Sequence, residues 1–140
     1  MAGATNTGES AFLNAVLGGG TSPAPLTNLG SCFISLHDTA DPGETAVFTN
    51  VCTGTGYANV AVTFTTASAD SVQNTATVTF TTNGNTDWGV IVGYGVHLSD
   101  TAGNCSAANM IISGEWDASA TVNAGDTVQI AAGDLVITCG

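Results

Sequence analysis

Three polar side chains in one short stretch have the residue types of an acid–base site. Ser35, His37 and Asp38 supply a hydroxyl, an imidazole and a carboxylate, the groups of a hydrolytic triad. Along a strand, however, Ser35 and His37 share one face while Asp38 falls in the following turn, and no nucleophile elbow or oxyanion-hole glycine motif accompanies them. We therefore predict that the protein is not an enzyme. His37 is expected to tie the strand end to the next turn by a ring hydrogen bond, and His97 is expected to be a similar strand-face residue.

The acidic turn after this strand has the ligand chemistry of a calcium site. Asp38, Asp41 and Glu44 are three hard oxygen ligands within seven residues. Their spacing does not match an EF-hand, and carboxylates in turns usually accept local hydrogen bonds. We therefore predict no metal and no cofactor, and Ca²⁺ at this turn stays an alternative.

Four aromatic side chains have the chemistry of a sugar-binding platform: Tyr57, Trp88, Tyr94 and Trp116. Each belongs to a row that alternates with other apolar residues, as is typical of side chains that face a hydrophobic core. The sequence therefore favours a core role for all four, with the sugar platform as the alternative.

The four cysteines are too far apart in the chain for a structural zinc site. Cys32, Cys52, Cys105 and Cys139 include no pair two to four residues apart, which is the usual spacing of zinc ligands. We predict reduced, partly buried thiols. The alternative is a pair of disulfides formed in an oxidising medium, with Cys32 bonded to Cys139 and Cys52 bonded to Cys105.

The charge of the chain excludes one class of partner. It has no Lys or Arg and 11 acidic residues, so its formal net charge is -11. Such a surface cannot neutralise a phosphate backbone, and an anionic membrane would repel it. We therefore predict no nucleic-acid and no membrane partner. Residues 1–5 lack a basic n-region and an apolar h-region, so synthesis in a cytoplasm is expected.

The side chains discussed above must be positioned mainly by short alternating strands. Turn sequences rich in Gly, Pro, Asn and Asp separate these apolar–polar segments, and no βαβ alternation occurs. For residues 30–140 the sequence predicts an all-β fold, an antiparallel β-sandwich or jelly roll with about eight short strands. The main expected strands cover 32–37, 57–66, 72–82, 88–98, 109–117, 128–130 and 135–137.

The strand expected over 88–98 has one bulky row and one small row. Trp88, Tyr94 and Val96 belong to the bulky row, while Gly93 and Gly95 belong to the row that faces the other way. Repeated glycine on one face indicates that something packs close to the backbone. We expect this strand to be central in the sheet.

Residues 1–29 are predicted to form an arm that consists of a short helix and a linker. Asn6 can cap a helix over 6–17, with Glu9 three residues further on and Gly18 as its stop. The helix is expected to cover one open end of the β core. The alternative is that Phe12 and Val16 dock it on a neighbouring subunit.

A second candidate contact surface lies in the long loop over 46–55. It carries Val47, Phe48 and Val51 among small and polar residues, and loops on a β scaffold are where contacts are commonly made. We therefore predict a partner interface that includes Phe12, Val16, Val47, Phe48 and Val51.

Four stretches together resemble a family of small tailed-phage virion proteins. Residues 36–45 (LHDTADPGET) are similar to the family's LHTADPGETG signature, and residues 56–62 (GYANVAV) to its GYARVAV strand. Residues 12–19 resemble its short N-terminal helix, and residues 122–135 its C-terminal hairpins. Asn59 replaces the family's arginine, so no role of that arginine is carried over.

The resemblance implies a bacteriophage structural protein, because members of this family are described as tail fibres or head decoration proteins. The first expectation is a capsid cement protein on the outside of the head. Its partners would be the major capsid protein and further copies of itself, as a dimer or trimer. The alternative is a tail-fibre or tail-tip module that binds a host receptor glycan.

Overall fold

The computed structural model describes residues 3–5, 32–40, 42–43, 45–66, 68, 71–82, 84, 86–99 and 101–138. The predicted helix over 6–17, the linker after it and the boundary at 29/30 lie outside these residues.

The described residues form an antiparallel all-β fold, as predicted. Two short 3-10 helices, η1 (Ala102–Asn104) and η2 (Ala107–Asn109), lie between the two longest strands. The strands are β1 (Gly3–Ala4), β2 (Cys32–His37), β3 (Val60–Val62), β4 (Ser71–Gln73), β5 (Val78–Thr81), β6 (Gly89–Leu98), β7 (Met110–Val122), β8 (Thr127–Ile130) and β9 (Val136–Thr138).

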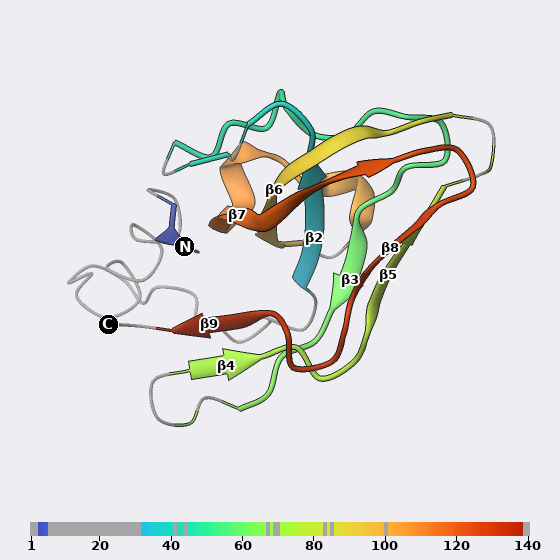
Figure 1. Ribbon diagram of the computed structural model, residues 1–140. Helices are drawn as coiled ribbons and strands as arrows, with labels where there is room; N and C mark the ends of the chain where they lie inside the picture. The colour runs from blue at the N-terminus through green and yellow to red at the C-terminus, as the bar shows by residue number, and fades with distance from the viewer. Residues whose placement is uncertain are drawn as a thin grey trace.

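The strands form one large sheet and two small ones. The large sheet has the order β1-β7-β6-β2-β3, while β4 pairs with β9 and β5 pairs with β8. Figure 1 shows the β5–β8 ribbon running beside β3 and apart from the centre of the large sheet. Buried side chains of the large sheet and of this ribbon belong to one hydrophobic cluster, including Ile34, Leu36, Val96, Val78, Phe80 and Ile130. The core therefore lies between two β layers, which is the arrangement of a sandwich.

The alternation of β2 explains why its two faces differ. Ile34 and Leu36 are completely buried in the hydrophobic core, and they pair with Val96 and Tyr94 of β6. Ser35 and His37 face the other way and are also completely buried. β2 is therefore buried on both faces. One face packs into the hydrophobic core, and the other carries the polar side chains of Ser35 and His37.

The alternation over 88–98 also predicts Val90 in the bulky row and Ile91 in the opposite row, and this part of the prediction is wrong, whereas Trp88 is buried in the core as expected. Ile91 is completely buried in the core, whereas Val90 is 41% exposed. The cause is a bulge, because Ile91 pairs with Ala120 but Gly93 pairs with Glu115. Four β7 residues, 116–119, thus stand opposite one β6 residue, Val92. The regular alternation of β6 side chains is interrupted at this point, so Ile91 and Tyr94 both face the core. The predicted close packing is confirmed at Gly95, where a Cβ would lie 2.8 Å from the Met110 side chain.

The second face of the large sheet carries a buried network of two imidazoles and one hydroxyl. Ser35 Oγ lies 2.9 Å from His37 Nε2 and 2.8 Å from His97 Nε2. The ring of Phe48 packs edge-on against both imidazoles, at centroid distances of 6.1 and 5.3 Å. The loop that contains Phe48 therefore covers this network. The His37 ring bonds to Ser35 of its own strand.

The partners of His97 fix its tautomer. Its Nδ1 faces two acceptors, the carbonyl of Ser106 at 3.2 Å and Oδ1 of Asn109 at 3.1 Å. Nδ1 must therefore carry the proton, because neither partner can donate. In the neutral ring Nε2 then accepts from the Ser35 hydroxyl, which in turn accepts from His37 Nε2. The Ser35 hydroxyl is thus the hydrogen-bond partner of Nε2 in both rings.

We expect the stability of the protein to fall as the pH is lowered below neutrality. Burial holds the pKa of His97 below its ordinary value of 6.5. The unfolded chain therefore takes up a proton at a higher pH than the folded protein does, so stability is lost as the pH falls from about 6.5. Urea unfolding at pH 7.5, 6.5 and 5.5 should show a decreasing midpoint. His97→Gln should have a weaker pH dependence over this range, and a midpoint independent of pH in the parent protein would contradict the explanation.

Candidate binding groove

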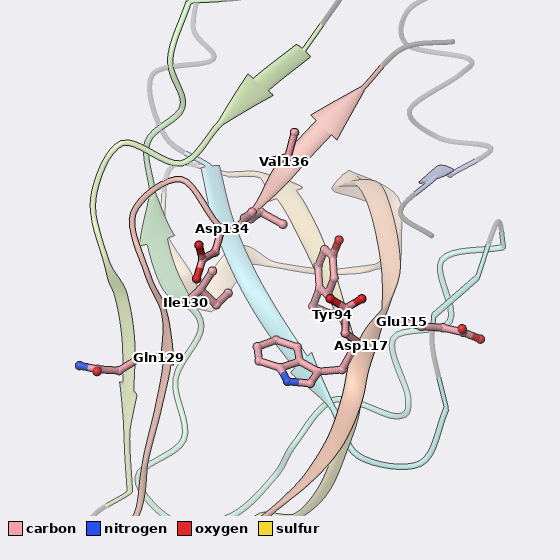
Figure 2. A pocket seen from close by; sticks show the side chains of 9 residues that line it. Tyr94, Glu115, Asp117, Gln129, Ile130, Asp134 and Val136 are labelled. Carbon is pink, nitrogen blue, oxygen red and sulfur yellow. The ribbon is translucent and has the colours of Figure 1, made fainter.

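A groove of about 390 Å³ separates β7 from the segment that contains β8 and the start of β9. Figure 2 shows Asp134 and Ile130 on one side of it and Tyr94 with Asp117 on the other. The lining is Tyr94, Glu115, Trp116, Asp117, Gln129, Ile130, Asp134, Leu135 and Val136. The groove thus combines two aromatic rings, aliphatic side chains, three carboxylates and an amide.

The β7 bulge positions the aromatic wall. Trp116 and Asp117 are the first two of the four bulged residues, so the regular ladder does not dictate where their side chains point. The Trp116 ring packs edge-on against the Tyr94 ring, with centroids 6.2 Å apart. Trp116 remains partly exposed. Bulges commonly redirect side chains in this way next to functional sites.

Gly114 makes room for Tyr94 beneath this wall. It pairs with Tyr94 across the ladder, and a Cβ at this position would lie 2.6 Å from the Tyr94 hydroxyl oxygen. Any larger residue would therefore displace the ring on which Trp116 packs. The sequence 114–117, Gly-Glu-Trp-Asp, carries most of this wall.

The opposite wall is held in place by one buried asparagine. Asn74 Oδ1 accepts hydrogen bonds from the backbone N–H groups of Gly133 and Leu135, at 3.1 and 2.9 Å. Its Nδ2 donates to the carbonyl of Ala131 at 2.8 Å. These bonds fix the turn between β8 and β9, in which Gly133 has a φ of +87°. The turn presents Asp134 and Leu135 to the groove.

The electrostatic character of the groove is purely acidic. Glu115, Asp117 and Asp134 line it, and its only other charged or amide side chain is the neutral Gln129. The three carboxylates do not gather around one point, since no group of three potential metal ligands occurs among the described residues. The groove therefore offers separate hydrogen-bond acceptors along its length.

This combination of groups suits a saccharide. A half-exposed indole beside a tyrosine ring gives a flat apolar surface for the C–H face of a sugar. The Asp117 and Asp134 carboxylates can accept hydrogen bonds from its hydroxyl groups, whereas Figure 2 shows the Glu115 and Gln129 side chains directed away from the groove. Ligand sites are typically concave, largely apolar and equipped with a few polar groups that fix orientation. The groove is concave and has polar groups beside aromatic and aliphatic side chains, although its lining is more polar than is typical.

Of the four aromatic residues predicted for the core, two lie in or against the core alone, and two also line the groove. Trp88 is buried, and Tyr57 packs edge-on against it at 5.2 Å, which confirms the core prediction for this pair. Tyr94 is also buried, but both it and Trp116 line the groove. The sugar platform that the sequence left as an alternative is therefore geometrically possible only at Tyr94 and Trp116.

Among the residues predicted for a partner interface, the three that the structure describes, Val47, Phe48 and Val51, do not line the groove. Phe12 and Val16 lie outside the described residues. Val47 is exposed, whereas Phe48 and Val51 are half-buried, and Phe48 covers the histidine network. An interface at this loop stays a prediction.

The remaining candidates are the residues of the acidic turn and the cysteines, and the structure describes only part of each set. Asp38 accepts a hydrogen bond from the Thr39 hydroxyl at 2.8 Å, and Asp41 and Glu44 lie outside the described residues. Cys32, Cys52 and Cys105 are free thiols, so the alternative disulfide between Cys52 and Cys105 is not formed in this structure. Burial is the main cause that raises the pKa of Cys52 to about 12, which makes its thiolate scarce. Cys139 lies outside the described residues.

Sequence analysis missed most of the groove. Asp117, Gln129, Asp134, Gly114 and Asn74 were not singled out, because each looks like an ordinary turn or strand residue. The one usable signal was Trp116, a large ring in a polar stretch between Glu115 and Asp117.

The described residues thus form a two-layer β core with an aromatic, acidic groove on its surface. The family of the chain is shown by a family model that matches residues 3–138 and is described as podophage GP4 fiber I protein gp80. The chain belongs to this family of podophage fibre proteins, and it is a phage virion structural protein. A search of curated proteins found no match. Among the described residues, none of the helices has the length and apolar character needed to cross a membrane.

Proposed function

We propose that this protein is a tail-fibre module that binds a saccharide of the host cell surface through the groove at Trp116. The observation that carries the proposal is the bulge in β7, which holds a partly exposed indole over Tyr94 at the edge of the groove. A bulge of four residues against one has no evident role in completing the hydrophobic core. It does build a surface on which a sugar ring can lie.

The family description supports the fibre function over the capsid-cement function that the sequence favoured first. The matching family is described as a fibre protein, and the match covers nearly the whole chain. The protein would then be located on the tail of the virion rather than on the outside of the head. Its partners would be the host saccharide and the neighbouring proteins of the tail.

The proposed function involves binding without catalysis. Ser35, His37 and His97 have the residue types of a reactive site, but all three are completely buried. None of them lines the groove. Ser35 bonds to Nε2 of both imidazoles, and His97 Nδ1 bonds to loop residues, as in a structural network.

We expect Trp116→Ala to weaken binding to host cells and to isolated surface polysaccharide by at least about tenfold, because aromatic anchors dominate many binding sites. Binding is measured with labelled protein over a concentration series. Val90→Ala is the matched control, since Val90 is an exposed apolar side chain outside the groove. Val90→Ala should unfold at nearly the same urea concentration as the parent, whereas Trp116→Ala should stay folded with a lower midpoint, because its ring packs against Tyr94 and the core. Unchanged binding of Trp116→Ala would overturn the proposed site.

The location on the virion has a separate test. Gold-labelled antibodies against the protein should decorate the tails of intact particles in electron micrographs. Decoration spread over the head would reverse the choice between fibre and cement.

A further inference from the structure

Both walls of the groove carry negative charge. Asp117 comes from the β7 bulge and Asp134 from the turn between β8 and β9, and Figure 2 shows them on opposite sides of the groove. Glu115 adds a third carboxylate. The chain has no Lys or Arg at any position that could balance these charges.

An anionic sugar would therefore find no countercharge in this groove. A uronic acid or a phosphorylated sugar would instead face two or three carboxylates of like charge, and bringing like charges together while removing water is unfavourable. A bridging metal does not solve this problem within the described residues, because the carboxylates are separated along the groove.

We propose that the groove selects saccharides that carry a primary ammonium group, such as hexosamines with a free amine. This inference rests on the proposed function and specifies its ligand. The sugar ring lies against Trp116, and its ammonium group donates hydrogen bonds to Asp117 or Asp134. Hydrogen bonds between a cation and a carboxylate are about twice as strong as those between neutral groups. An acetylated amine at the same position keeps an N–H donor but loses the charge.

The test uses three oligosaccharides of equal length: β-1,4-linked glucosamine, its N-acetylated form, and oligogalacturonate. Titration calorimetry with the full chain, at a pH at which the amine is protonated and at low ionic strength, gives the three affinities. We expect the glucosamine oligomer to bind about tenfold more tightly than the N-acetylated one, and oligogalacturonate to show no binding. The glucosamine preference should shrink as salt is added, because salt screens partly exposed charges.

Isosteric variants assign this preference to the groove. In the double variant Asp117→Asn with Asp134→Asn, the ratio between the glucosamine and N-acetylglucosamine affinities should fall to about one. Asp38→Asn is the matched control, because it removes one charge outside the groove and keeps an acceptor for the Thr39 hydroxyl. It should retain the tenfold ratio.

Three results would overturn the inference. Equal binding of the charged and acetylated oligomers, or tighter binding of oligogalacturonate, would do so while leaving saccharide binding intact. Failure of all three oligomers to bind, when host polysaccharide is still bound through Trp116, would also reject the ammonium preference and preserve the proposed function. Loss of host polysaccharide binding as well would reject both.

Discussion

Replacing Gly54 with alanine is expected to lower the free energy of unfolding by about 3 kcal/mol, near the upper end for overpacked cores. A Cβ at this position would lie 2.1 Å from Cδ1 and 2.8 Å from Nε1 of Trp88. The indole cannot simply move aside. It is 4% exposed and packs edge-on against Tyr57, and the backbone N–H of Trp88 donates to the Val122 carbonyl at 2.9 Å, which fixes the main chain that carries the ring. The new methyl group must therefore displace either the core or the loop.

Gly103→Ala is the matched control for this experiment. No atom lies within 4 Å of its potential Cβ, and its φ is not in the left-handed region. Urea unfolding followed by tryptophan fluorescence should show a large fall in the midpoint for Gly54→Ala and almost none for Gly103→Ala. Equal midpoints for the two variants would mean that Trp88 is not fixed where the structure places it.

Ser35→Ala is expected to cost a similar amount, about 3 kcal/mol, although it removes a single oxygen. The Ser35 hydroxyl is the shared partner of His37 Nε2 and His97 Nε2, and both rings are completely buried. Each buried polar atom left without its partner costs about 1–3 kcal/mol.

Ser119→Ala serves as the control, since Ser119 is an exposed β-strand serine. It should change the free energy of unfolding by less than about 0.5 kcal/mol. If Ser35→Ala were equally mild, water or a rotated imidazole would have to replace the lost bonds. A crystal structure of the variant would show which replacement occurs.

The parts of the fold that follow local rules could be predicted from the sequence. The alternation over Cys32–His37 gave the bounds of β2 without error. The Asn-Ala-Gly-Asp turn is present with Gly125 at a φ of +90°, because glycine tolerates this conformation. These features depend on a few neighbouring residues, and such patterns are visible in a single chain.

The groove could not be predicted, because it depends on pairings between distant segments. The bulge at 116–119 is defined only by the register of β7 on β6, and the sequence over 109–117 reads equally well as a regular strand. The turn at 131–135 is held in position by hydrogen bonds to Asn74, about sixty residues earlier in the chain. The buried histidine network likewise joins residues 35, 37 and 97 only after the sheet has formed.

The excess residues of β7 have an evolutionary consequence. Positions 116–119 lie outside the paired ladder between Ile91–Ala120 and Gly93–Glu115, and all but Trp116 are exposed. Replacement of the three exposed residues, 117–119, therefore leaves strand pairing and core volume nearly untouched. If the groove binds a host saccharide as we propose, a phage lineage that meets a new host can vary these three codons at little cost to folding, and adaptation to altered bacterial coats would concentrate there.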